Sequence, residues 1–81
     1  MKRGIAILGS TGSIGTQAVE VCLRHPDMFS VELLTAGQNS ALLIEQAIRL
    51  LPDAVVIAEE SKYSEVNEAL SPHDIKVFTL H

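Results

Sequence analysis

The sequence predicts an α/β fold in which parallel strands alternate with helices. Four short apolar runs alternate with three stretches whose apolar residues have helical spacing, and glycine or proline stands at most of the junctions. No repeat or low-complexity segment interrupts this alternation. The order β-α-β-α-β-α-β is typical of one half of a doubly wound parallel sheet.

The first part of the chain contains a strand, a helix and a second strand. The strand is expected at about residues 4–8. The helix begins near Ser13 and has an apolar stripe of Ile14, Ala18, Val21 and Cys22. It should end before Pro26, because a residue that precedes proline is disfavoured in the helical region. The second strand follows at about residues 30–35.

The second helix is expected at about residues 40–51, where Pro52 stops it. It should bury Leu43, Ala47 and Leu50, or their neighbours. The next strand, at about residues 54–58, is continuously apolar, which is typical of strands buried on both faces of a parallel sheet.

The last part of the chain contains one more helix and one more strand. Ser61 can cap a third helix that reaches about Leu70, and the final strand is expected at about residues 75–80. Right-handed crossovers with a reversal after the third strand predict the strand order 3-2-1-4. This order leaves one apolar edge of the fourth strand unpaired, which is an aggregation hazard. We therefore expect residues 1–81 to be a portion of a larger protein.

Composition limits the classes of function. The 81 residues are 47% hydrophobic and 20% charged, and their net charge is −4. This charge argues against a non-specific nucleic-acid binder, because no cluster of Lys or Arg is present to neutralise phosphates. The single cysteine, Cys22, excludes a disulfide framework and is expected to be a small core residue. The apolar run after Lys2 and Arg3 is too short for a signal peptide or a membrane span, so a cytoplasmic setting is expected.

The most informative segment joins the first strand to the first helix. It reads Ile5-Ala-Ile-Leu-Gly-Ser-Thr-Gly-Ser-Ile-Gly15. Its first glycine, Gly9, permits a tight turn, Gly12 lets the backbone approach a pyrophosphate, and Gly15 lets the helix pack closely. The helix N-terminus adds unpaired N–H groups and a partial positive charge. The segment therefore predicts a dinucleotide-binding, Rossmann-like fold.

The glycine spacing is wider by one residue than the commonest dinucleotide fingerprint. Hydroxyls that can donate to phosphate oxygens are present at Ser10, Thr11 and Ser13. A mononucleotide P-loop is excluded, because no lysine lies near the turn. A glycine-rich connection without a ligand and an S-adenosylmethionine site both stay open.

The second strand ends in Thr35-Ala-Gly-Gln-Asn-Ser40, where an NAD site would place Asp or Glu to accept from the ribose 2′-hydroxyl. The nearest acid, Glu32, stands in the body of the strand. Small hydrogen-bonding residues tolerate a 2′-phosphate, so this turn favours NADP(H) over NAD(H). The basic side chain that usually pairs with the 2′-phosphate is missing from the turn. A plain turn followed by a helix cap is the alternative.

Five segments resemble one known family. They are Ile7-Leu-Gly-Ser-Thr-Gly-Ser-Ile-Gly-Thr-Gln17, His25-Pro-Asp27, Ala36-Gly37-x-Asn39, Leu42-Leu-Ile-Glu-Gln-Ala47 and Val55-Val-Ile-Ala58. Together they are similar to the N-terminus of the 1-deoxy-D-xylulose 5-phosphate reductoisomerases. The resemblance covers essentially the whole chain, and only Leu80 and His81 look foreign to it.

The resemblance implies an NADPH-dependent oxidoreductase that isomerises and reduces 1-deoxy-D-xylulose 5-phosphate to 2-C-methyl-D-erythritol 4-phosphate in non-mevalonate isoprenoid biosynthesis. It also implies Mg²⁺ or Mn²⁺ as a second cofactor, a phosphorylated sugar as substrate and a homodimer, with no nucleic-acid or membrane partner. Residues 1–81 would be the N-terminal NADPH-binding portion. The metal ligands and catalytic residues would lie further along the full-length chain, so this portion alone would be inactive.

The resemblance also assigns roles at both turns. The cofactor pyrophosphate would be contacted, through backbone amides and hydroxyls, by Thr11, Gly12, Ser13 and Ile14. The adenosine ribose and its 2′-phosphate would be surrounded by Gly37, Gln38 and Asn39. Many relatives have a basic residue where Gln38 stands, and neutral donors from Gln38, Asn39 and Ser40 can partly replace it.

Two other functions stay open, a non-catalytic dinucleotide-sensing module and another NADP-dependent reductase with the same glycine spacing.

Glu59 and Glu60 follow the third strand and are expected in a solvated loop. The three histidines have no partner at ligand spacing, so no metal site is predicted within these residues.

Overall fold

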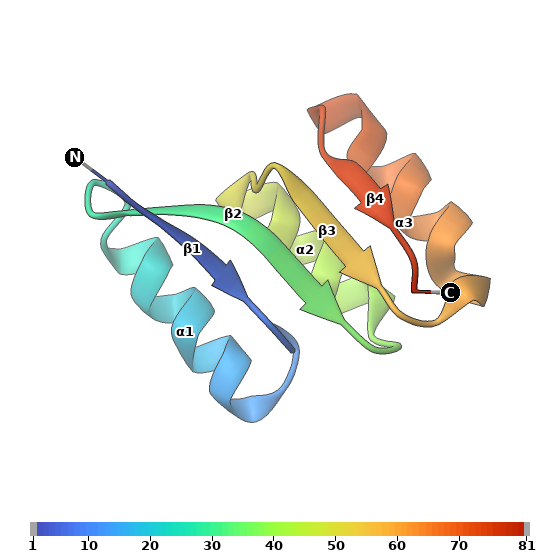
Figure 1. Cartoon of the computed structure of the whole chain (residues 1–81), viewed down its shortest axis with the longest axis horizontal. Coiled ribbons are helices and arrows are strands. Elements are labelled where there is room, and N and C mark those ends of the chain that lie inside the picture. Colours follow the sequence, from blue (N-terminus) through green and yellow to red (C-terminus); the bar gives the residue numbers. More distant parts are fainter. Residues whose placement is uncertain (1, 81) are drawn as a thin grey trace.

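The structure, a computed structural model, describes residues 2–80. The strands are β1 (Arg3–Ile7), β2 (Phe29–Ala36), β3 (Ala54–Ile57) and β4 (Lys76–Phe78). The helices are α1 (Ser13–Arg24), α2 (Ser40–Leu50) and α3 (Tyr63–Leu70), and the short 3₁₀ turns η1 (Glu60–Lys62) and η2 (Ser71–His73) flank α3. All strand pairs are parallel, so the predicted α/β class and the order β-α-β-α-β-α-β are confirmed (Figure 1).

The strands lie in the order β1-β2-β3-β4, so the predicted order 3-2-1-4 is wrong. Strand β4 pairs with β3, where Val77 lies beside Val55, and not with β1. The reason is the short return from α3: the Ile75 N–H donates to the Leu70 carbonyl at 3.3 Å, which holds the start of β4 next to the end of the helix. A connection this short cannot carry the chain past β2 and β1.

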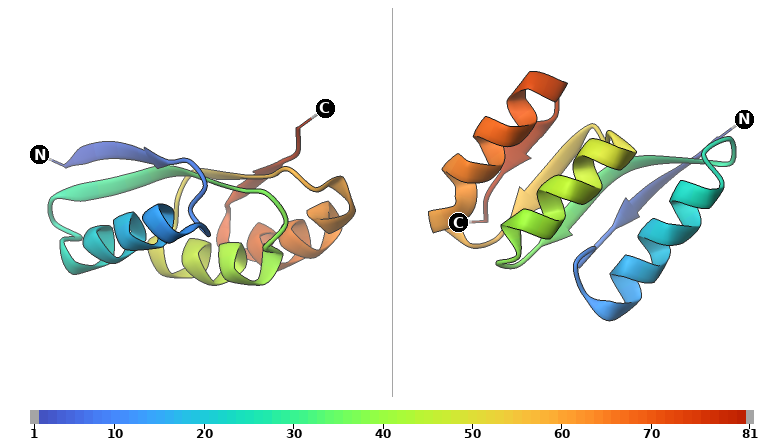
Figure 2. Two further views of the ribbon diagram at one scale, coloured as in Figure 1. Left: turned by 90° about the horizontal axis from the view of Figure 1, so that it is seen from below. Right: turned by 180° about the vertical axis from the view of Figure 1, so that it is seen from behind.

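All three helices cover the same face of the sheet (Figure 2). Each new strand is added on the same side of the previous one, so connections of one hand place every helix on one face. Within residues 2–80 the other face has no covering helix. It carries Leu33, Val56 and Phe78, which alternate with core residues along their strands. We call this surface the open face.

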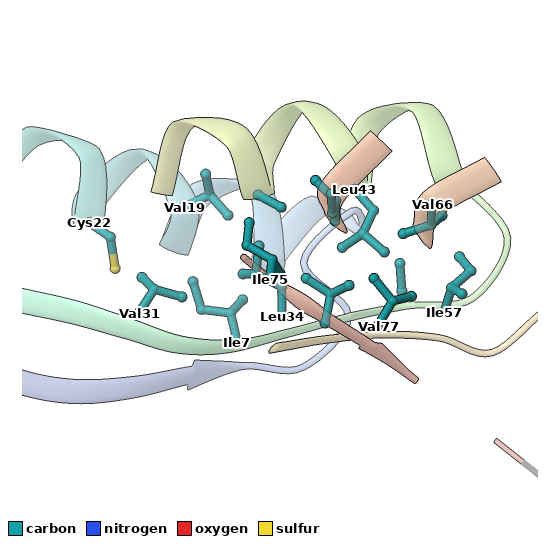
Figure 3. Close-up of a cluster of buried hydrophobic side chains, with 14 residues drawn as sticks. Ile7, Val19, Cys22, Val31, Leu34, Leu43, Ile57, Val66, Ile75 and Val77 are labelled. Carbon is teal, nitrogen blue, oxygen red and sulfur yellow. The ribbon is translucent and has the colours of Figure 1, made fainter. Parts of the chain in front are cut away.

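The core lies between the sheet and the helices (Figure 3). Strand residues such as Leu34 and Val55 pack against helix residues such as Leu43 and Val66, and all four are fully buried. The predicted burial of Leu43 and Ala47 is confirmed, whereas Leu50 is only half-buried. Cys22 is a core residue as predicted, and burial raises the pKa of its thiol.

Two predictions about the helices are wrong in part. On α1, Ile14 is 81% exposed and Val21 is 47% exposed. Of the predicted stripe, Cys22 is buried and Ala18 is partly buried, and the other buried positions are Gly15 and Val19. The stripe is rotated because Gly15, and not Ile14, packs on the turn before the helix. Ser61 does not cap α3; it lies in η1 and donates its hydroxyl to Glu59 Oε1 at 3.2 Å.

Every helix within residues 2–80 is too short or too polar to traverse a bilayer.

Candidate functional site

Two turns meet at one edge of the sheet. Because β1 and β2 are parallel and paired, their carboxyl ends are neighbours, and the chain leaves both strands at the same edge (Figure 1). We call residues 8–12 the first turn and residues 37–39 the second turn. The structure places all seven predicted cofactor residues in these turns or at the start of α1, namely Thr11, Gly12, Ser13, Ile14, Gly37, Gln38 and Asn39.

Thr35, at the end of β2, fixes the first turn. The Gly9 N–H donates to Thr35 Oγ1 at 2.9 Å, and the Ser10 N–H donates to the Thr35 carbonyl at 2.8 Å. Within the turn, the Gly12 N–H donates to the Gly9 carbonyl at 3.0 Å. Thr35 was not among the residues predicted for the site, and the signal that could have indicated it is a hydroxyl at the end of the strand next to the glycine turn.

The glycines of the first turn are required for different reasons. Gly9 has a φ of +69°, a conformation that side chains disfavour. A Cβ at Gly15 would overlap the Gly9 carbonyl oxygen and lie 2.7 Å from Ser10 Cα, so the helix can approach the turn only because no side chain is present. At Gly12, in contrast, a Cβ would meet only the Gly9 oxygen, at an ordinary 3.4 Å. Backbone conformation therefore explains Gly9 and internal packing explains Gly15, but neither requires a glycine at position 12.

Gly37, in the second turn, resembles Gly12 in this respect. It is exposed, its φ is not in the left-handed region, and a Cβ there would meet no atom within 4 Å. Gly12 and Gly37 thus leave backbone without a side chain in two neighbouring turns, although neither packing nor backbone conformation requires glycine there. A ligand that lies against the backbone would explain both glycines.

The start of α1 presents unpaired N–H groups to the same edge. Its N-cap is Gly12, which has no side-chain cap, and the first helical hydrogen bond runs from the Thr16 N–H to the Gly12 carbonyl at 2.8 Å. The N–H groups of Ser13, Ile14 and Gly15 precede that bond, and the helix dipole adds positive potential. Ser13 and Ile14 are exposed, so an anion can reach this end of the helix.

The hydroxyls near the first turn are not equivalent. Ser10 is fully buried, so the prediction that its hydroxyl donates to a phosphate is wrong. Its Oγ is buried without a hydrogen-bond partner in the described part of the chain, and its N–H is bonded to β2. Thr11 is half-buried and Ser13 is exposed, so these two remain candidates.

In the second turn, Asn39 caps α2: its Oδ1 accepts the Leu42 N–H at 3.2 Å. The side-chain NH₂ of Asn39 is not used by this cap. Ser40 is buried, so of the three neutral donors expected at this turn only Gln38 and Asn39 are exposed. The Gly37 carbonyl accepts the Glu59 N–H at 2.9 Å, which ties the turn to the end of β3.

A buried glutamine, which was not among the residues predicted for the site, also contacts the first turn. Gln46 on α2 donates from Nε2 to the Ser10 carbonyl at 2.8 Å. Among residues 2–80, no group of three or more His, Cys, Asp or Glu side chains is placed to hold a metal ion.

The parallel sheet and its helices define an α/β protein of the Rossmann-like class. In this class ligands bind at the carboxyl ends of the strands, where the two turns of this chain lie. The family model for 1-deoxy-D-xylulose 5-phosphate reductoisomerase matches residues 5–81, and the chain belongs to that family. Because the match runs to residue 81, the expectation that the last two residues are foreign to the family is wrong; residue 81 itself lies outside the described residues.

Individual relatives agree with this assignment. The chain is 56% identical over 78 residues to the reductoisomerase of Phocaeicola vulgatus and 54% identical over 77 residues to that of Bacteroides fragilis. These matches cover 96% and 95% of the chain but 20% of each relative, so the chain spans about a fifth of their length.

Solved structures of the family share the fold. A Zymomonas mobilis reductoisomerase in complex with NADPH superposes with a TM-score of 0.93 at 33% identity, over 98% of this chain and 21% of that one. A DOX-P reductoisomerase in complex with NADPH, fosmidomycin and magnesium gives a TM-score of 0.87 at 22% identity, over 96% of this chain and 19% of that one. At that identity the likeness shows the fold alone.

Proposed function

We propose that this chain is the NADPH-binding portion of a 1-deoxy-D-xylulose 5-phosphate reductoisomerase. The observation that carries the proposal is Gly12, whose bare backbone is not required by internal packing and lies at the uncapped start of α1. The Zymomonas mobilis relative, which was solved with NADPH, supports it through its close superposition on this chain.

Each turn would hold one part of the cofactor. Thr11, Gly12, Ser13 and Ile14 would contact the pyrophosphate. The N–H groups of Ser13 and Ile14 are left free by the helix and would donate to it, whereas Gly12, whose N–H donates to the Gly9 carbonyl, would let the phosphates approach the backbone. Gly37, Gln38 and Asn39 would surround the ribose and its 2′-phosphate, and no carboxylate stands in this turn to repel that phosphate.

In the full-length protein, NADPH would supply the hydride that reduces the rearranged sugar phosphate. The substrate would be 1-deoxy-D-xylulose 5-phosphate and the product 2-C-methyl-D-erythritol 4-phosphate. The ligands for Mg²⁺ or Mn²⁺, the catalytic residues and the homodimer contacts would come from the rest of a full-length cytoplasmic enzyme, so residues 1–81 would be inactive alone.

Calorimetric titration of the intact protein with NADPH tests the cofactor assignment. Gly12→Val should abolish binding, because the side chain would occupy the place of the pyrophosphate. Gln17→Val, an exposed position on α1 outside both turns, is the matched control and should bind as the wild type does. Equal affinity of the wild type and the Gly12 variant would refute the site.

An activity assay separates the enzyme from a sensing module. The intact protein should oxidise NADPH only when both 1-deoxy-D-xylulose 5-phosphate and a divalent metal ion are present. Binding of NADPH without any oxidation under these conditions would instead favour a dinucleotide sensor.

A further inference from the structure

A buried amide group links α2 to the first turn. Gln46 is 4% exposed and Ser10 is 0% exposed, and Gln46 Nε2 donates to the Ser10 carbonyl at 2.8 Å. The two residues are 36 positions apart in the sequence, so this bond connects separate elements. Among residues 2–80, no other side chain donates to the Ser10 carbonyl.

Core packing alone does not account for Gln46. Its neighbours along the buried side of α2, Leu43 and Ala47, are apolar and fully buried. Gln46 Oε1 and Ser10 Oγ are themselves buried without a hydrogen-bond partner in the described part of the chain. Burial of such atoms is unfavourable for the fold, and an apolar side chain of similar size would avoid part of that cost. The amide is therefore better explained by what its one bond holds in place.

That bond fixes the direction of a neighbouring donor. In a trans peptide the C=O of one residue and the N–H of the next point in opposite directions. The Ser10 carbonyl points toward Gln46, so the Thr11 N–H points away from α2. The Ser10 N–H belongs to the preceding Gly9–Ser10 peptide and donates to the Thr35 carbonyl at 2.8 Å, so Ser10 is anchored through the peptides on both of its sides.

We propose that Gln46 is a positioning residue that aims the Thr11 N–H at the pyrophosphate of the bound dinucleotide. This inference rests on the proposed cofactor site. Gln46 touches no cofactor itself and acts through the Ser10–Thr11 peptide. It also joins the two turns mechanically, because the helix that carries Gln46 begins at the second turn, where Asn39 caps it.

The test compares two ligands on the intact protein. NADP⁺ needs both turns, whereas adenosine 2′-phosphate carries the ribose phosphate but no pyrophosphate. Gln46→Met should weaken NADP⁺ binding about tenfold and leave the affinity for adenosine 2′-phosphate unchanged. Leu43→Met, a volume-conserving change one turn earlier on the same face of α2, should change neither affinity.

A second variant keeps the inference testable if Gln46→Met does not fold. Gln46→Glu preserves the shape of the side chain, and its carboxyl can donate to the Ser10 carbonyl only when protonated. Binding of NADP⁺ relative to the wild type should therefore recover as the pH is lowered from 8.5 to 5.5, whereas binding of adenosine 2′-phosphate relative to the wild type should not change with pH. A merely structural role would make both ligands follow the pH, because a buried carboxylate would disturb α2 as a whole.

Each other outcome overturns the inference. If the Gln46 variants bind NADP⁺ with wild-type affinity, the amide does not position the Thr11 N–H. If they bind NADP⁺ and adenosine 2′-phosphate with equally reduced affinity, the substitution disturbs α2 in general. If the wild-type protein does not bind NADP⁺ at all, the proposed function fails first, and this inference fails with it.

Discussion

Gly15 in α1 lies directly against Gly9 in the first turn, so close that a Cβ at position 15 would overlap the Gly9 carbonyl oxygen. The same oxygen accepts the Gly12 N–H at 3.0 Å. One carbonyl therefore sets both the shape of the turn and the approach of the helix, and the start of α1 is positioned by backbone contact.

Gly15→Ala should destabilise the protein. Alanine is favoured over glycine inside a helix by about 1 kcal/mol, but the overlap forces the helix and turn apart, and overpacking of this kind costs about 1–3 kcal/mol. We expect a net loss of up to about 2 kcal/mol, near the upper end of this range because backbone atoms cannot rotate out of the way. Urea unfolding measures this loss. Gly12→Ala is the matched control, since its Cβ meets only an ordinary contact, and a loss as large in that variant would contradict the explanation.

Thr35→Val should weaken both the fold and the proposed cofactor site. The change removes the hydroxyl that accepts the Gly9 N–H at 2.9 Å while keeping the shape of the side chain. We expect a loss of about 0.5–1.5 kcal/mol in stability and weaker NADPH binding, because the first turn loses one of its attachments to β2. Thermal unfolding and titration of the intact protein measure the two effects. Thr35→Ser retains the hydroxyl and should restore most of both.

Gln38→Arg should raise the preference for NADPH over NADH. A guanidinium in the second turn can form charge-assisted hydrogen bonds with a 2′-phosphate, and Gln38 is exposed and neutral. We expect NADPH to bind about tenfold more tightly, while NADH, which lacks that phosphate, binds as before. Titrations at low and high salt provide the check: the gain should shrink as ionic strength rises. An equal gain for both cofactors would place the 2′-phosphate elsewhere.

Cys22 should make the fold less stable in alkali. Burial raises the pKa of its thiol above the ordinary value, so folding disfavours the thiolate. The stability that the buried neutral thiol contributes is fully present below the ordinary thiol pKa of about 8.5, and it is lost as the pH rises through the higher pKa of the folded state. Urea unfolding of the wild type between pH 7 and 10 should show this decline. In Cys22→Ala the decline should be smaller, and an identical profile would count against the thiol as its cause.

The alternation of strands and helices could be predicted because it depends on local pattern. Apolar runs such as 54–58 and breakers such as Pro26 and Pro52 act within a few residues, and each predicted element is present near its expected bounds. The strand order could not be predicted in this way. A right-handed connection is satisfied on either side of the sheet, and the choice depended on the Ile75–Leu70 contact that returns the chain beside β3.

In the candidate site, too, some features follow from local sequence and others depend on contacts between segments that are distant in the chain. The glycines and the free N–H groups follow from their position between a strand and a helix, which the sequence makes visible. The burial of Ser10 and the bond from Gln46 depend on how α2 lies against the first turn. A glutamine in the middle of an amphipathic helix has no local signature of such a contact, because its partner is a main-chain oxygen distant in sequence.

The open face has a practical consequence for work on residues 1–81 by themselves. With Leu33, Val56 and Phe78 in contact with solvent, an isolated sample would hydrate apolar area at an unfavourable free energy of about 25 cal/mol per Å². Such a sample should bind hydrophobic dyes and require detergent or dilute conditions to remain dispersed. Threonine or lysine at these three positions would preserve extended backbone and yield a more tractable reagent.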